Sequence, residues 1–174
     1  MNTQIDMPKV EFYWGRTNQP TATFDALIKM GYLDAPASKG HHLAKPGGLV
    51  LHSMRVTDHL LQTQAVSEES AYRIGMYHDL VKCQCYKAID GGKYEYTQPP
   101  YPGHGIASAM IAADIGIELT PIERAAIVWH MGAFGLDERQ MKEYEAALHQ
   151  WPIPLIFTHA ADHLASIQEE IENA

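Results

Sequence analysis

The chain has 174 residues, enough for one domain with a sizeable core that needs no disulfides to fold. Its apolar fraction of 46 % and charged fraction of 20 % are ordinary for a soluble globular protein, and no apolar run of about 18 residues predicts a membrane span. The net charge of −8 argues against a general nucleic-acid binder, which carries a broad basic surface. The start lacks a secretory signal and the only cysteines are Cys83 and Cys85, so we expect a cytoplasmic protein.

The first half of the chain predicts helices separated by loops. We expect an irregular arm over residues 1–20 and a short helix that Thr21 or Thr23 caps and Gly31 ends. Residues 33–48 contain two prolines and three glycines, which predict a loop. Apolar periodicity predicts a helix over residues 49–63, and Ser67 begins a second helix that continues into residues 78–81.

The second half predicts one β-hairpin followed by further helices. The hairpin covers residues 83–97, with Asp90-Gly91-Gly92 as its turn, and it places both cysteines on one strand face. A proline-rich loop at residues 99–103 follows. Four segments have helical patterns: 104–115, 120–130 with a Thr-Pro start, the charged segment 137–149, and a last helix from Pro152 or Pro154 to the acidic end.

These elements predict a mainly α fold with one small β-hairpin. No internal repeat or low-complexity stretch divides the chain. We expect a single domain in which residues 1–32 form an arm and short helix packed on the core, and residues 33–174 form the core itself.

The ten histidines are the first unusual feature of the composition. Several of them, with two aspartates, lie in or at the ends of predicted helices, where helical bundles place metal ligands from facing helices. Imidazole and carboxylate ligands suit Mn, Fe, Co, Ni or Zn better than Ca. The candidate ligands are His52, His78, Asp79, His104, His130 and Asp162.

Five segments carry a resemblance to a known family. Residues 35–56 read APASKGHHLAKPGGLVLHSMRV, 77–82 read YHDLVK, 102–105 read PGHG, 128–132 read VWHMG and 159–164 read HAADHL. Each segment alone is weak, but in this order they resemble the HD superfamily of metal-dependent phosphohydrolases, in particular the HD part of certain bacterial 3′-5′ exoribonucleases. The resemblance covers roughly residues 33–168 and implies an HD-domain helical bundle.

The resemblance also implies a metal site with one or two divalent transition-metal ions. His52, His78, Asp79 and Asp162 would hold the first ion, and His104 and His130 would add a second one bridged by Asp79. The alternative for His104 and His130 is a helix-terminal histidine that interacts with the helix dipole. His159, three residues before Asp162 on the same helix face, is a candidate partner of a ligand.

The implied chemistry is attack of a metal-activated water on phosphorus. Asp79, Lys82 and His42 are the candidate catalytic residues, and Lys82 could meet a developing phosphate charge. His41, His42, Lys45 and Lys82 are the candidate substrate-binding residues, and either histidine could donate a proton to the leaving group. The alternative for the residues of the 41–45 loop is a solvated role.

We therefore expect hydrolysis of a phosphoester in a nucleotide or short oligonucleotide. The acidic charge and the lack of room for a further nucleic-acid-binding domain disfavour long nucleic acids, and we expect no membrane partner. Residues 12–14 and 137–149 are candidate homodimer surfaces, and the alternative is that either segment caps the core. Two alternatives stay open: a di-iron oxygenase with the same ligands, and a non-catalytic nucleotide-binding sensor.

Overall fold

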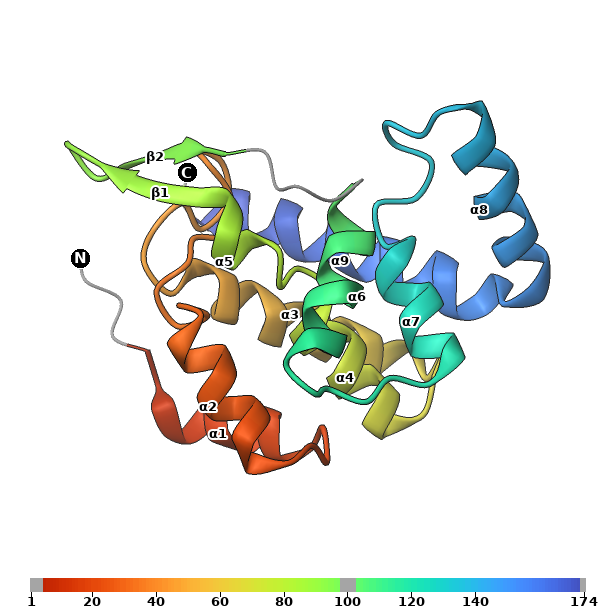
Figure 1. Ribbon diagram of the computed structural model, residues 1–174, viewed down its shortest axis with the longest axis horizontal. Coiled ribbons are helices and arrows are strands. Elements are labelled where there is room, and N and C mark those ends of the chain that lie inside the picture. The colour runs from red at the N-terminus through yellow and green to blue at the C-terminus, as the bar shows by residue number, and fades with distance from the viewer. Residues whose placement is uncertain (1–4, 98–102, 173–174) are drawn as a thin grey trace.

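The computed structural model describes residues 5–97 and 103–172, and its fold is mainly α-helical with one two-stranded antiparallel sheet (Figure 1). The predicted fold class is thus confirmed. Most of the predicted 99–103 loop lies outside the described residues. The elements in chain order are α1 (Met7–Gly15), α2 (Thr21–Lys29), α3 (Gly48–Thr63), α4 (Glu68–Tyr77), α5 (Lys82–Cys85), β1 (Tyr86–Ile89), β2 (Lys93–Tyr96), α6 (His104–Asp114), α7 (Pro121–Val128), α8 (Glu138–Gln150) and α9 (Pro152–Glu172).

Helix α3 lies at the centre of the fold and packs most extensively against α4 and α9. Its side chains Leu49, Val56 and Leu60 are completely buried, because they recur on one face at helical spacing. His52 is completely buried on the same helix. The central helix therefore carries a titratable side chain into the core.

Among the described helices, none has the length and apolar character needed to cross a bilayer.

A close approach of α3 and α4 depends on Gly75. A Cβ atom at this position would lie 2.7 Å from the backbone Cα of Thr57, a separation that real side chains do not adopt. Thr57 is itself buried and its hydroxyl donates to the carbonyl of Ser53, so it cannot move aside freely. The missing side chain thus sets the distance between the helix that carries His52 and the helix that leads to His78.

The prediction of an irregular arm over residues 1–20 is wrong, because residues 7–15 form α1. The side chain of Asp6 accepts a hydrogen bond from the Lys9 backbone N–H, and a proline occupies the first turn. Only Val10 and Tyr13 of this helix are buried, so its apolar pattern is too short to reveal the helical period.

The region between α4 and the hairpin also differs from the prediction. Helix α4 ends at Tyr77, and a tight turn closes when the Lys82 N–H donates to the Asp79 carbonyl at 2.9 Å. Both cysteines lie in the one-turn helix α5 instead of on a strand; Cys85 is buried and Cys83 is partly buried. The hairpin itself is confirmed, with Tyr86 opposite Tyr96.

Candidate metal centre

Four separate elements bring a cluster of histidines and aspartates together in the interior. His52 comes from α3, His78 and Asp79 from the turn after α4, His130 from the turn after α7, and Asp162 from α9. The three histidines are completely buried, Asp79 is 2 % exposed, and Asp162 is partly buried. Each helix end or helix face is fixed by its packing, so the cluster is built on rigid elements.

The Nε2 atoms of the three histidines face the two carboxylates. His52 Nε2 lies 3.0 Å from an oxygen of Asp162, and His78 Nε2 lies 3.2 Å from Oδ2 of Asp79. His130 Nε2 lies 3.4 Å from the other oxygen of Asp79, Oδ1. Longer separations of 3.7 Å join His78 to Asp162, and of 3.9 Å join His52 to Asp79. The five side chains therefore converge on one small volume.

Hydrogen bonds at Nδ1 turn Nε2 of each histidine toward the two carboxylates, where Nε2 can bind a cation. In His78 and His130, Nδ1 lies 2.9 Å and 2.7 Å from the backbone carbonyl three residues earlier, to which it donates. In His52, Nδ1 lies 3.0 Å from a carboxylate oxygen of Glu169. An imidazole that donates from Nδ1 presents the lone pair of Nε2, which is the form that binds a metal ion.

Several polar atoms of the cluster are buried without a hydrogen-bond partner. Within residues 5–97 and 103–172, they include Nε2 of His78, Oδ1 of Asp79 and Nε2 of His130. A buried polar atom without a partner costs about 1–3 kcal/mol. All three atoms belong to the same cluster, so one or two bound cations would satisfy them together.

The donor separations suit a transition-metal ion. Two ligand atoms about 2.1 Å from one ion lie roughly 3.0–3.4 Å apart at tetrahedral or octahedral angles. The ligand atoms of His52, His78, Asp79 and Asp162 all lie within 4.8 Å of one another. A second group, His42, His52 and Glu169, meets the same criterion. The buried His/Asp cluster can thus hold a metal ion.

The two carboxylates of the cluster, Asp79 and Asp162, need positive charge beside them. Burial lowers the pKa of His78, but the charges of Asp79 and Asp162 outweigh it and raise the pKa to about 10. Burial raises the pKa of Asp79, but the charge of Lys82 and that of His78 bring it well below its usual value. Without a cation, protons on imidazoles therefore balance the two carboxylates.

Lys82 lies beside the cluster at the wall of a cavity. Its Nζ atom is 2.6 Å from Oδ2 of Asp79. Burial lowers the pKa of Lys82, but the charges of Asp79 and Asp162 outweigh it and raise the pKa, so the ammonium group stays charged. Lys82 thus lines the cavity next to the candidate metal position.

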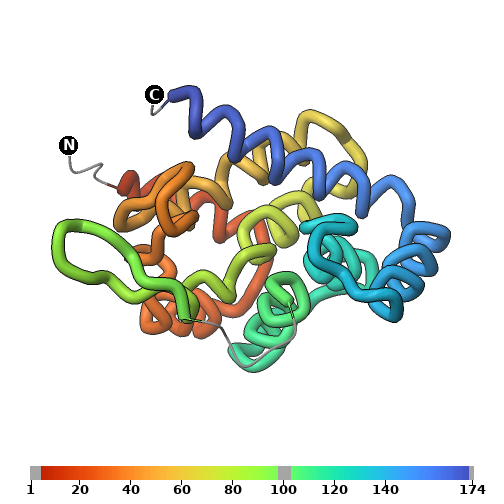
Figure 2. Tube along the Cα trace, turned by 90° about the horizontal axis from the view of Figure 1, so that it is seen from above, coloured from red at the N-terminus to blue at the C-terminus, as the bar shows by residue number. Residues whose placement is uncertain are grey.

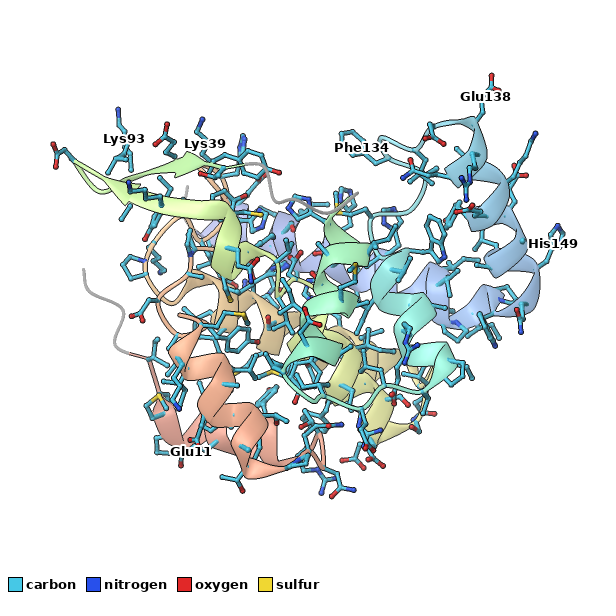
Figure 3. The ribbon with its side chains drawn as sticks, in the orientation of Figure 1. Glu11, Lys39, Lys93, Phe134, Glu138 and His149 are labelled. Atoms are coloured by element: carbon cyan, nitrogen blue, oxygen red, sulfur yellow. The ribbon has the colours of Figure 1, made fainter. Side chains whose placement is uncertain are left out.

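The cavity has a volume of about 740 Å³, in the range of small-molecule sites. Besides Asp79, Lys82 and Asp162, it is bordered mainly by histidines and apolar or aromatic side chains. These are Ala37, His42, Tyr86, His104, Met131, Ala133, Phe134, His159 and His163, with Ser38 and Ser166. Phe134 is 80 % exposed and lies on the loop between α7 and α8, toward the side that carries the hairpin (Figure 3).

The remaining predicted residues separate into two groups. His42 and His104 line the cavity, and the His42 ring lies 5.1 Å from that of His52. Burial, together with the charges of His52 and Lys82, lowers the pKa of His42 to about 4. His41 is exposed and does not border the cavity, and Lys45 borders a different hollow. The structure therefore brings His42 and His104 to the site but not His41 or Lys45.

From the sequence, Glu169 is not identified as part of the site, and His159 is identified only as a candidate partner of a ligand. Glu169 is completely buried against His52, although it stands among the acidic residues at the chain end. Its position seven residues after Asp162, two helical turns, is the signal that places both on one face of α9. Nδ1 of His159, the suspected partner of a ligand, lies 2.8 Å from the His130 carbonyl, to which it donates.

The fold and the cluster define a mainly α-helical protein with a buried His/Asp site that can bind a metal ion. Comparisons with protein families, with curated proteins and with solved structures found no match to this chain. The residues of the site and the cavity beside them are therefore the basis on which a function can be inferred.

Proposed function

We propose that this chain is a metal-dependent phosphohydrolase of the HD superfamily that cleaves a phosphoester in a nucleotide or short oligonucleotide. One observation carries the proposal. Asp79 faces the Nε2 atoms of buried histidines through both of its oxygens and lies 2.6 Å from a charged lysine at the cavity wall. Candidate metal ligands and a cation that can bind phosphate lie side by side, and phosphoester hydrolysis uses such an arrangement.

Two positions for metal ions follow from the two oxygens of Asp79. His52, His78, Asp79 and Asp162 would hold one ion. Asp79, His130 and His104 would hold a second ion; His130 Nε2 lies 3.4 Å from Oδ1 of Asp79, and His104 lines the cavity. The bound metal, which we expect to be Mn, Fe, Co, Ni or Zn, supplies a water of lowered pKa and polarises the phosphoryl oxygens.

The residues around the cluster would position the substrate. The Lys82 ammonium can donate hydrogen bonds to a phosphate oxygen on the cavity side while Asp79 holds it in place. His42, with a pKa of about 4, is neutral at pH 7 and offers a hydrogen bond instead of a positive charge. Burial also lowers the pKa of His104. Neutral imidazoles at the cavity wall would orient the phosphate, and Lys82 would balance its charge.

The rim of the cavity favours a substrate that carries a base. Phe134 is 80 % exposed at the cavity edge, and Tyr86 lies in the lining. An exposed aromatic ring beside a phosphate-binding group is typical of sites that stack a nucleobase, which contributes about 1–3 kcal/mol. The net charge of −8 favours a small nucleotide over a long nucleic acid.

The test is turnover by the purified protein with Mn²⁺ and a pooled panel of nucleoside phosphates, cyclic nucleotides, dinucleoside polyphosphates and short RNAs. Mass spectrometry identifies the products. We expect one substrate class to be consumed by the wild type and not by Asp79→Asn. Asp114→Asn, which changes an exposed aspartate at the end of α6, is the matched control and should remain active.

The panel also separates the alternatives. Free phosphate as the product identifies a monoesterase, and a nucleotide identifies a diesterase or pyrophosphohydrolase. A protein that binds metal but turns over no phosphoester contradicts the proposal. Oxygen consumption by an iron-loaded sample would then support a di-iron oxygenase, and nucleotide binding without turnover would support a sensor.

A further inference from the structure

Helix α9 is apolar on two opposite faces. Its inner face packs into the core through buried residues that include Leu155, Ala161 and Ala165, and it carries Asp162 and Glu169 to the metal centre. A surface helix is expected to be polar on the side away from the core. Instead, the outer side of α9 carries six large apolar side chains that are each between 39 % and 72 % exposed: Ile153, Ile156, Phe157, Leu164, Ile167 and Ile171.

The spacing of this outer face is that of a coiled-coil seam. Apolar residues recur at alternating steps of four and three along the helix, at positions 153, 157, 160, 164, 167 and 171. This is the a/d heptad pattern, through which one helix interdigitates with another. The six positions, which we call the outer stripe, span 18 helical steps, about 27 Å at 1.5 Å per residue. A contact with another helix along its whole length fits this pattern.

The outer stripe is uncovered by the described chain. In Figure 2, α9 runs across the upper part of the view, and no other helix is drawn in front of it. The neighbours of α9 among the described elements are chiefly α3 and α7, and then α8. Together with Ile156, the exposed side chains of the outer stripe amount to apolar surface on the order of 500 Å², at the upper limit of what a monomer exposes.

We infer that the outer stripe binds the outer stripe of a second copy of this chain. Two such surfaces would together bury on the order of 1,000 Å² of apolar area, and flanking polar atoms would add to it. This total reaches the size of a specific interface. A membrane surface is a poorer partner, because α9 contains no lysine or arginine and membrane-surface helices are rich in both. A two-fold axis pairs identical stripes with each other.

The charges on α9 favour antiparallel pairing. Glu170 and Glu172 lie near the negative end of the helix dipole. Parallel pairing would place these carboxylates and both helix C-termini next to their copies, whereas antiparallel pairing separates them. In the antiparallel arrangement, Ile153 of one chain lies opposite Ile171 of the other, and the pair is centred near Asp162. Helix α9 then lies between the interface and the candidate metal centre of each chain.

The oligomeric state of the full chain is the first test. Light scattering after gel filtration, over a range of concentrations, should give twice the 19.4 kDa mass of one chain. The double variant Leu164→Glu and Ile167→Glu should raise the dissociation constant at least about tenfold, because two charges enter an apolar seam. Its circular dichroism and melting temperature at low concentration should match the monomeric wild type, since both positions are exposed. Met110→Glu, at a 44 % exposed position on α6, is the control and should stay dimeric.

Cysteine cross-linking tests the orientation. A mixture of Ile153→Cys and Ile171→Cys chains should form a 153–171 disulfide under mild oxidation, and neither variant alone should link to itself through the new cysteine. Mass spectrometry of the linked peptides distinguishes these products from any that involve Cys83 or Cys85. A 171–171 link would overturn the antiparallel arrangement. A wild type that stays monomeric at all concentrations, or a double variant that stays dimeric, would overturn the interface itself.

Discussion

Glu169 and Asp162 hold the His52 imidazole between them. A Glu169 oxygen lies 3.0 Å from Nδ1, and an Asp162 oxygen lies 3.0 Å from Nε2. The two acidic residues are seven positions apart on α9, so one helix face determines both the orientation of the ring and one of its partners at the candidate metal centre. Glu169 itself is completely buried, which makes its charge costly unless neighbouring groups balance it, and both His52 and Arg55, whose Nε lies 3.9 Å from a Glu169 oxygen, face it.

The first prediction concerns this buried contact. Glu169→Gln keeps the shape of the side chain but removes the charge that fixes the tautomer of His52, so we expect metal affinity to fall about 10- to 100-fold. A competition titration against a chromophoric chelator measures the affinity. Glu170→Gln changes the neighbouring exposed residue and should bind metal as the wild type does. Equal affinity of the wild type and Glu169→Gln would refute the role of Glu169.

The second prediction concerns the pH dependence of the metal-free protein. His78 has a pKa of about 10 in the folded protein, against an ordinary value of 6.5. Because the folded state binds this proton more tightly, its contribution to stability is complete below about pH 6.5 and is lost as the pH rises to about 10. Lys82, whose pKa is also raised, stays charged over this window.

We therefore expect the free energy of unfolding in chelator to fall between pH 6.5 and 9.5, by up to about 1.4 kcal/mol per pH unit for each proton. Urea unfolding at several pH values measures it. His78→Gln should show a smaller fall, and saturating metal should reduce the fall in the wild type because the cation replaces the proton. A stability that rises with pH in the metal-free wild type would contradict the assignment.

The third prediction tests the close approach of α3 and α4. Gly75→Ala would place a Cβ atom 2.7 Å from the Thr57 Cα, so we expect a loss of unfolding free energy of about 1–3 kcal/mol and weaker metal binding. Gly15→Ala is the matched control, because no atom lies within 4 Å of a Cβ there, and it should change stability by less than about 1 kcal/mol. If Gly75→Ala and Gly15→Ala have the same free energy of unfolding, the close approach of α3 and α4 does not determine the position of His78.

The fourth prediction tests base recognition. Phe134→Ala removes an exposed ring from the cavity edge, so we expect KM for a nucleotide substrate to rise about tenfold or more while kcat changes little. A substrate with the same phosphoester but no aromatic group should show an unchanged KM. The melting temperature should also be unchanged, since the ring is 80 % exposed. An equal effect on both substrates would argue against stacking.

Much of the fold could be predicted because caps and periodicity agree. Thr120 and Glu123 form the capping box of α7, Asp137 caps α8, and Ser67 caps α4, each at the predicted start. Helices α1 and α5 escaped prediction because short helices owe their stability to tertiary packing more than to their own residues. Tyr13 of α1, for example, meets Asp58 of α3, a partner 45 residues away.

The candidate site could also be predicted only in part from the sequence. The ordered histidine and aspartate motifs gave the five residues that converge, because each motif lies at a helix end or face. Glu169 was not singled out from its neighbouring acidic residues, although its spacing of seven residues from Asp162 places both on the face of α9 that packs on α3. His41 and Lys45 share a loop with His42, and sequence does not reveal which loop residues reach the cavity.

Metal content is the most direct test of the central claim, that the His52, His78, Asp79 and Asp162 cluster binds a transition-metal ion. Plasma mass spectrometry would be applied to protein stripped with chelator and then equilibrated with Mn, Fe, Co, Ni or Zn. We predict at least one ion per chain in the wild type and in Asp114→Asn, and a loss of that ion in Asp79→Asn and Asp162→Asn that remain folded. Wild-type protein that retains none of the five metals, or Asp79→Asn protein that retains as much as the wild type, would contradict the account.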